Sequence, residues 1–199
     1  MTVAPRLVLA SASPRRRELL TLLGLEATVV PAEVDETYVA GEDPPAHAER
    51  LAREKAEWVA ARSSGALVIG GDTVVVEGGR VLGKPSSEEE ATAMLLSLAG
   101  REHEVLSAVA LAGLGETASA VGRARVWFRA FGPETARSYA QTGEPMDKAG
   151  AYGIQGLGAA LVDRIEGDYY TVVGFPITRF LELLELRGWR YAFGRLEAI

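Results

Sequence analysis

The sequence predicts an α/β protein built on a mixed β-sheet. Short apolar runs typical of strands alternate with longer helical patterns along the chain. At 199 residues, with 48% hydrophobic and 24% charged residues, the composition is that of a globular protein with a substantial core. No apolar run reaches the roughly 18–20 residues that a membrane span needs. The length suits one large domain or two small lobes.

The first elements follow from their boundary residues. The apolar run Leu7–Ala10 predicts a buried strand, and Ala27–Val30 predicts a second. Ser13-Pro14 predicts the start of a helix that runs to about Leu23. Serine suits the N-cap, proline suits the first helical position, and Gly24 suits the position after the end.

A long helix is predicted over about Pro45–Arg62. Six of its residues recur at helical spacing and should face the core, namely Ala48, Leu51, Ala52, Lys55, Ala56 and Val59. Leu67–Ile69 and Thr73–Val76 then predict two strands, with Gly70-Gly71-Asp72 as an interruption between them. Gly78-Gly79 is typical of a hairpin turn, here leading into Val81-Leu82.

The second half of the chain continues the alternation. Ser87 and Glu90 indicate a capping box for a helix of about Glu88–Leu98. Apolar alternation and prolines at helix starts predict the remaining elements. These are strands near Glu104–Leu111, Ala118–Phe128 and Ala160–Ile165, helices over Pro133–Gln141 and Pro176–Leu186, and a glycine-rich loop over 150–158.

Composition and charge exclude several classes of function. The absence of cysteine excludes disulfides, thiolate nucleophiles and Cys-zinc sites, and two histidines argue against a multi-histidine metal site. The net charge of −6 argues against nucleic-acid binding. Residues 1–17 nevertheless carry four arginines and no acid, which suits a small polyanion. The N-terminus does not resemble a signal peptide, so we expect a cytoplasmic protein with no membrane partner.

The chain contains only three lysines, against eighteen arginines. Lys55, Lys84 and Lys148 therefore mark positions where a compact ammonium is needed, or they are chance survivors of an arginine bias. Lys55 lies on the apolar helix face with no acid three or four residues away. Its side chain either extends outward to water or delivers its ammonium into a site. Lys84 and Lys148 lie in short segments rich in Gly, Pro and Asp.

The segment from Ser11 to Arg17 predicts an anion site, because a strand, a tight turn and a helix start come together there. Cations in the first helical turn oppose the helix dipole, unless a bound anion offsets them. Consecutive helical residues fan out by roughly 100°, so we expect only one or two of the three arginines to touch the ligand, Arg15 first. The alternative is a solvated helix start.

Asp72 is the strongest candidate for a general base or a metal ligand. A carboxylate inside an apolar run is costly unless it is paired or bound to metal, although a turn aspartate is the alternative. The acidic group Glu33, Asp35 and Glu36 could hold Mg²⁺ or could be a solvated loop. Gln155 could read a nucleobase edge or could be a plain loop residue. Cations, a buried acid and the lack of a histidine base together fit phosphate chemistry with a divalent metal.

Four segments resemble the signature blocks of the Maf family of nucleoside triphosphate pyrophosphatases. They are Ser11–Leu20, Gly70–Val75, Gly83-Lys84-Pro85 and Asp147–Gly156, in the family's order and over about residues 7–180. The resemblance implies a single Maf-like domain over residues 1–199. It also implies an elongated mixed sheet flanked by helices, two lobes around a central cleft as in anomalous-nucleotide pyrophosphatases, and a homodimer.

The resemblance also implies an activity and a set of site residues. The activity is hydrolysis of a nucleoside triphosphate to the monophosphate and pyrophosphate with Mg²⁺ or Mn²⁺. Asp72 would be the proton acceptor and, with Glu33, a metal ligand. Arg15, Thr73 and Gln155 match the marks of the subgroup that acts on dTTP and UTP. The other substrate-binding positions would be Ser13, Lys55, Lys84 and Lys148. Gly71 stands where the family commonly has alanine.

Two alternatives stay open at this point. One is a pyrophosphatase of the same family for another base, such as 7-methyl-GTP, and modified pyrimidine nucleotides are further candidate substrates. The other is a non-catalytic nucleotide-binding regulator of cell division. We expect the three lysines to converge on one phosphate-binding cleft with Arg15 and Asp72.

Overall fold

The computed structural model describes residues 4–39 and 41–199, which form two compact units. Unit 1 comprises Met1–Asp72, Ser107–Gly122 and Gly174–Ile199, and unit 2 comprises Thr73–Leu106 and Arg123–Val173. The chain enters each unit more than once, so the units are not two consecutive sequence domains. The single domain over 1–199 stays a prediction.

A mixed sheet confirms the predicted fold class. Its main path runs β2-β1-β3-β5-β6-β7, and β4 pairs with β3 beside that path. β1 pairs in parallel with β2 and with β3, where Leu7 lies opposite Leu67, whereas the β3–β4 and β6–β7 pairs are antiparallel. The bounds are β1 Arg6–Leu9, β2 Ala27–Val29, β3 Ala66–Glu77, β4 Arg80–Leu82, β5 Glu102–Ala112, β6 Ala118–Phe128 and β7 Val162–Gly167.

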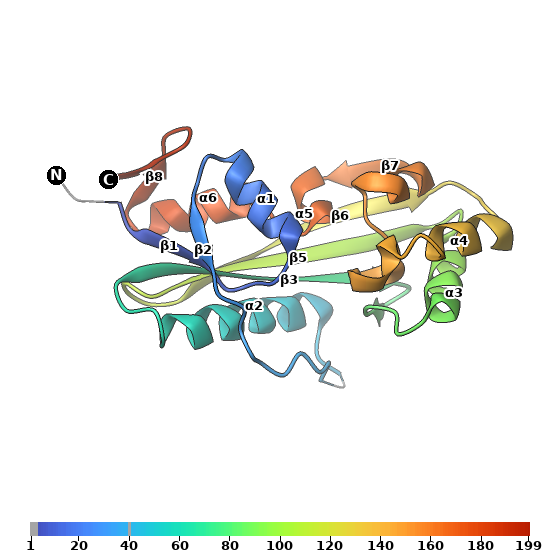
Figure 1. The fold of residues 1–199 in the computed structure, drawn as a ribbon, viewed down its shortest axis with the longest axis horizontal. Helices are drawn as coiled ribbons and strands as arrows, with labels where there is room; N and C mark the ends of the chain where they lie inside the picture. The colour runs from blue at the N-terminus through green and yellow to red at the C-terminus, as the bar shows by residue number, and fades with distance from the viewer. Residues whose placement is uncertain (1–3, 40) are drawn as a thin grey trace. The chain divides into compact units, whose positions relative to one another are not determined.

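Helices cover both faces of the strands of unit 1. Helix α2 (Pro44–Ala60) lies on one face, and α1 (Pro14–Leu22) and α6 (Ile177–Leu186) lie on the other (Figure 1). All six residues of the apolar stripe predicted for α2 are buried, Lys55 included. The sequence did not predict the C-terminal hairpin of β8 (Trp189–Tyr191) and β9 (Leu196–Ala198). Its Tyr191 hydroxyl donates to the carbonyl of Leu23, which ties the hairpin to the end of α1.

Strand β3 corrects one prediction from the sequence. Gly70-Gly71-Asp72 does not interrupt it, because β3 runs unbroken from Ala66 to Glu77. A β-carbon at Gly70 would lie 2.1 Å from the carbonyl oxygen of Ala52 and 2.9 Å from the Ala56 side chain. Glycine at this position therefore marks a close approach of α2 rather than a turn.

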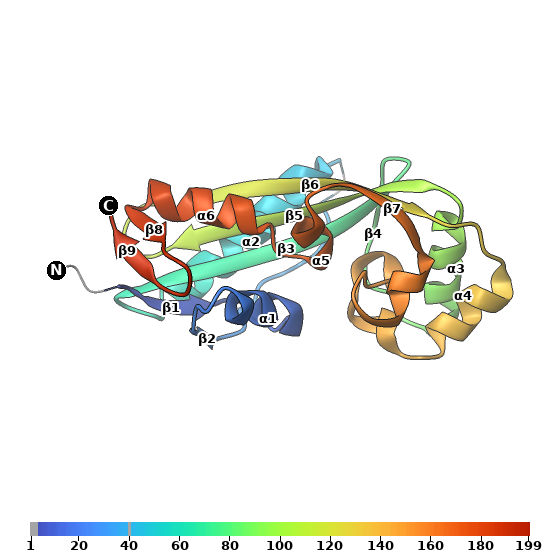
Figure 2. The same ribbon diagram turned by 90° about the horizontal axis from the view of Figure 1, so that it is seen from above.

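Unit 2 has a hydrophobic core of its own. Helices α3 (Glu88–Leu98) and α4 (Pro133–Ala140) pack against each other (Figure 2), and a short α5 (Tyr169–Val173) was not predicted. Ser87 caps α3 as expected by accepting from the Glu90 N–H, but the Glu90 carboxylate accepts from Ser86 instead of Ser87. Among the residues that the structure describes, none of the helices is long and apolar enough to span a membrane.

His103 is a buried polar residue in the core of unit 2. Its Nε2 lies 2.8 Å from the Tyr152 hydroxyl, and its ring packs edge-on against Phe128. Its Nδ1 has no hydrogen-bond partner among the described residues. Burial disfavours the charged imidazolium and lowers the pKa of His103 from 6.5 to about 4.

Replacing Gly70 by alanine should destabilise the fold. The new β-carbon would collide with the α2 backbone, and overpacking of this kind costs about 1–3 kcal/mol. Urea unfolding should show this loss for Gly70→Ala. Gly83→Ala is the matched control, because a β-carbon there meets nothing within 4 Å. Equal midpoints for the two variants would contradict the close approach of α2.

Acid should weaken the fold through His103. Because its pKa in the folded state lies below 6.5, the unfolded chain takes up the proton first. The contribution to stability is thus complete above pH 6.5 and is lost as pH falls toward 4. Between pH 7 and 4.5 the loss should be about 2–3 kcal/mol larger for the parent than for His103→Gln, as measured by urea unfolding. If the two proteins lose equal stability, His103 does not carry the effect.

Candidate active site

A buried ion pair joins α2 to β3 in unit 1. The Lys55 ammonium donates to Oδ1 of Asp72 at 2.7 Å, and the two side chains are only 8% and 11% exposed. Lys55 therefore does not extend outward to water, and the alternative of a turn aspartate is wrong. The same ammonium also pairs with Glu36 at 2.8 Å. Removing one partner of such a pair strongly destabilises the fold, because the remaining charge stays buried.

The alternation of side chains along β3 explains how this pair forms. Gly70 and Asp72 are two residues apart, so both face α2. At Gly70 the missing side chain lets the α2 backbone come close. At Asp72 the carboxylate meets the lysine from the buried stripe of that helix. The glycine and the acid are thus parts of one arrangement.

The start of α1 contains a buried arginine, but it is Arg16 rather than Arg15. Its Nη1 donates to Oγ of Ser11 at 3.0 Å, and its Nε donates to the carbonyl of Gly174 at 3.0 Å. Burial lowers the pKa of Arg16, and the charge of Asp72 only partly offsets this. Ser13 occupies the predicted N-cap, but its side chain makes no capping bond; its N–H donates to Ser11 at 3.2 Å.

Sequence reasoning gave first place to Arg15, which is only partly buried. The helical period contains the missed signal. Arg16, Leu19 and Leu20 are the three buried residues of α1, and they are spaced three and four residues apart on one face. Whether Arg15 touches a ligand stays a prediction.

Gly71 faces away from α2 and leaves room for Arg16. A β-carbon there would lie 3.0 Å from Nε and 3.3 Å from Cδ of that arginine, and 3.3 Å from the carbonyl oxygen of Ala108. Glycine in place of the family's common alanine therefore leaves space for the buried Arg16 side chain.

The acidic loop between β2 and α2 contributes Glu36 to the ion pair, although the Glu36 side chain is 49% exposed; Glu33 is exposed as well. Asp35 accepts from the Thr37 N–H at 2.9 Å and shapes the loop itself. In residues 4–39 and 41–199 no three His, Asp or Glu side chains are grouped closely enough to suggest a metal site. Asp72 and Glu36 nevertheless meet at one ammonium. Two carboxylates fit a divalent cation that takes its other ligands from phosphate and water.

In unit 2, Lys148 is held by its own loop. Its ammonium donates to the carbonyl of Glu144 at 2.5 Å and to Asp147 at 2.6 Å. Its stem lies over Gly153, where a β-carbon would come within 2.8 Å of Cε. The Gly150 N–H donates to the carbonyl of Gly83 at 3.0 Å, which brings the loop of Lys84 next to this segment.

Glu144 organises the segment that follows Gln155. Its carboxylate accepts from the N–H groups of Leu157 and Gly158, each at 3.0 Å, and from the Tyr139 hydroxyl at 2.8 Å. Burial acts to raise the pKa of Glu144, but these hydrogen bonds outweigh it and the pKa is lowered. Gln155 itself is exposed.

The predicted site residues thus form two sets. Lys55 and Asp72 lie in unit 1 with Ser13, Arg15 and Glu33, whereas Thr73, Lys84, Lys148 and Gln155 lie in unit 2. Thr73 directly follows Asp72 on β3. The convergence of all three lysines on one cleft stays a prediction.

Comparison with known proteins identifies the family. The protein-family model described as "Maf-like protein" matches residues 6–187. The chain belongs to the Maf family. Among its relatives, the dTTP/UTP pyrophosphatase of Syntrophomonas wolfei is 50% identical over 182 residues, covering 90% of this chain and 96% of that protein. The dTTP/UTP pyrophosphatase of Myxococcus xanthus is 53% identical over 188 residues, covering 92% and 95%.

The Moorella thermoacetica relative, also named dTTP/UTP pyrophosphatase, is 52% identical and covers 92% of this chain and 95% of its own length. A solved HAM1 protein from Coxiella burnetii aligns with a TM-score of 0.43 at 17% identity, covering 62% of this chain and 73% of that one. A TM-score this low does not establish a shared fold. The elongated shape and the cleft between lobes stay expectations from the Maf resemblance.

Removing Lys55 should leave Asp72 as an unpaired buried charge. We expect Lys55→Met to cost about 3 kcal/mol in urea unfolding, because breaking a buried pair costs more than replacing both partners. The double variant Lys55→Met/Asp72→Asn should be more stable than the sum of the two single losses predicts. Strictly additive losses would mean that the two side chains do not interact.

Proposed function

We propose that the protein is a nucleoside triphosphate pyrophosphatase that hydrolyses dTTP and UTP to the monophosphate and pyrophosphate. The observation that carries this proposal is the buried Asp72 carboxylate. It accepts a hydrogen bond from Lys55 and interacts electrostatically with Arg16 at the start of α1. The names of the three relatives support the same reaction and substrates.

In this mechanism Asp72 accepts a proton from a water molecule. The water oxygen bonds to the α-phosphorus, the bond from that phosphorus to the bridging oxygen breaks, and pyrophosphate leaves. Lys55 holds Oδ1 of Asp72, so the carboxylate keeps one orientation. The negative charge that develops on the leaving group is met by cations, for which Arg15, Lys84 and Lys148 are the proposed sources.

Asp72 and the acidic loop would hold the divalent cation, Mg²⁺ or Mn²⁺. Glu33 is the loop ligand predicted from the sequence, and Glu36 is the one whose carboxylate meets the same ammonium as Asp72. A bound cation would supply charge neutralisation to the phosphate oxygens. Asp72 would then act as both a ligand and a proton acceptor, or chiefly as one of these.

Recognition of the pyrimidine is assigned to Thr73 and Gln155. Gln155 is exposed on a loop whose backbone Glu144 holds in place, so its amide is available to a base edge. Modified pyrimidine nucleotides fit the same assignment. The homodimer and the cytoplasmic location stay predictions.

Replacing Asp72 by asparagine should abolish the activity. Asparagine keeps the shape of the side chain but does not accept the proton of water, so we expect a loss of at least a hundredfold in pyrophosphate release from dTTP. Asp163→Asn is the control, because Asp163 is an exposed acid on β7 that has no part in the proposed site. Hydrolysis by Asp72→Asn near the parent rate would refute the assignment.

A panel of dTTP, UTP, CTP and 7-methyl-GTP separates the alternatives in the same assay. Preference for dTTP and UTP supports the proposal, and preference for 7-methyl-GTP assigns the enzyme to another base. Binding without release of pyrophosphate from any nucleotide would instead favour a regulator.

A further inference from the structure

The loop between β2 and α2 carries Glu33 and Glu36, the two loop acids considered as metal ligands, but the part of it that the structure describes has no regular structure of its own. From Val30 to Asp43 its described residues form neither helix nor strand. Irregular loops of this length are uncommon in compact proteins and are usually either functional or disordered. The position of Glu33 and Glu36 therefore depends on what holds this loop.

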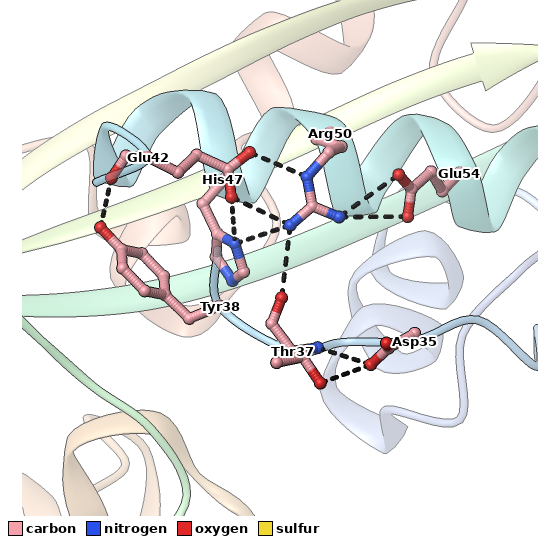
Figure 3. Close-up of polar contacts among 7 residues, drawn as sticks. All are labelled: Asp35, Thr37, Tyr38, Glu42, His47, Arg50 and Glu54. Atoms are coloured by element: carbon pink, nitrogen blue, oxygen red, sulfur yellow. Dashed lines mark hydrogen bonds and ion pairs between the residues drawn. The ribbon is translucent and has the colours of Figure 1, made fainter. Parts of the chain in front are cut away.

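Lys55 and Arg50 make three of the contacts that join the loop to α2, and Arg50 makes two of these three. The first is the Glu36–Lys55 ion pair. In the second, Nη2 of Arg50 lies 3.5 Å from the carbonyl oxygen of Thr37, the residue directly after Glu36. In the third, Arg50 binds Glu42 near the end of the loop, so one guanidinium contacts the loop at two separate points (Figure 3).

The Arg50–Glu42 contact is bidentate. Nε donates to Oε1 at 2.8 Å and Nη2 donates to Oε2 at 2.9 Å, the geometry in which arginine binds a carboxylate most strongly. Nδ1 of the buried His47 lies 2.9 Å from the same Oε2. The hydrogen bond from Arg50, followed by that from His47, lowers the pKa of Glu42 to about 2, so this carboxylate stays ionised.

Glu54 and Tyr38 hold the cluster of Arg50, Glu42 and His47 in place. Glu54, one turn along α2, accepts from Nη1 of Arg50 at 3.3 Å and orients the guanidinium from the other side. The Tyr38 ring packs against His47 with 4.8 Å between the ring centroids, and its hydroxyl donates to the carbonyl of Glu42. Figure 3 shows Glu42, His47 and Glu54 around Arg50, with the Tyr38 hydroxyl at the carbonyl of Glu42.

We propose that Arg50 is a positioning residue that fixes the loop between β2 and α2 on that helix and so holds Glu36 against Lys55. Arg50 and Lys55 belong to the same helix, so the loop residues bound by one are placed relative to the other. Arg50 acts on the reaction only through this loop, and its effect on hydrolysis rests on the proposed function. The Arg50–Glu42 pair is partly buried, with side chains that are 29% and 15% exposed. Because it joins an irregular loop to α2, we expect its loss to act first on the loop.

Arg53 offers a matched control on the same helix. It also lies beside an acid one turn away, Glu57, at 3.5 Å, and it donates to the carbonyl of Thr117 and to Oγ of Ser119 at 3.3 and 3.1 Å. These contacts tie α2 to the start of β6 and, among the described residues, involve none of the loop between β2 and α2. Arg50→Met and Arg53→Met each remove one guanidinium and keep a long side chain that favours a helix.

The first measurement needs no substrate and no metal. Chymotrypsin can cut after the exposed Tyr38, and the masses of the two fragments identify that cut. Local opening of the loop controls its rate. We expect cleavage at this bond to be about tenfold faster in Arg50→Met than in the parent, and unchanged in Arg53→Met. Thermal unfolding midpoints should be alike for the two variants.

The second measurement is the kinetics of dTTP hydrolysis. We expect kcat/KM to fall about tenfold in Arg50→Met and to stay within twofold in Arg53→Met. The kcat/KM of Arg50→Lys should lie between those of the parent and Arg50→Met, because an ammonium does not reproduce the bidentate contact. Glu42→Gln should resemble Arg50→Met, and the double variant should be little worse than either single one, since both break the same contact.

Three outcomes would overturn the proposal. One is equal cleavage of Arg50→Met and Arg53→Met. Another is faster cleavage with unchanged kcat/KM, which would make the cluster structural only. The third is a loss of activity in which Arg50→Met and Glu42→Gln are additive. A parent protein that hydrolyses no nucleotide would instead refute the proposed function, and the cleavage rates would then decide whether Arg50 fixes the loop.

Discussion

The pairing of Asp72 with Lys55 is the constraint on which the rest of unit 1 depends. A carboxylate in the middle of an apolar strand is stable only if a cation reaches it, and that cation comes from the buried face of α2. The helix comes close enough because β3 carries glycine two residues earlier on the same face. Strand, glycine and helix are therefore coupled: moving α2 outward would leave both charges without their partner.

The same helix organises the acidic loop, so α2 links the two sources of carboxylate in the candidate site. Lys55 contacts Glu36, and Arg50 contacts the loop beside Glu36 and again at Glu42. On this helix the compact ammonium of Lys55 is buried between two different carboxylates, whereas the planar guanidinium of Arg50 binds both oxygens of one carboxylate, Glu42. This division of roles gives the scarcity of lysine in the sequence a physical meaning at one of its three positions.

Parts of the candidate site could be predicted because they lie on periodic elements. The helical period of α2 placed Lys55 on the buried face, and the cost of burying an acid singled out Asp72. The same period could have shown that Arg16, and not Arg15, turns inward with Leu19 and Leu20. No such rule applies to an irregular loop, where spacing does not tell which of Glu33 and Glu36 meets the lysine.

The sequence by itself determined the α/β class, most helix and strand positions and the Maf family, because periodicity, caps and motif blocks are local in the chain. It did not determine that β3 runs through Gly70-Gly71-Asp72, since the same glycines suit a turn and a close approach. Only the tertiary structure decided between these, by placing the α2 backbone against Gly70. It also decided the partners of Lys55, Arg16 and Arg50, because their contacts join residues that local patterns do not relate.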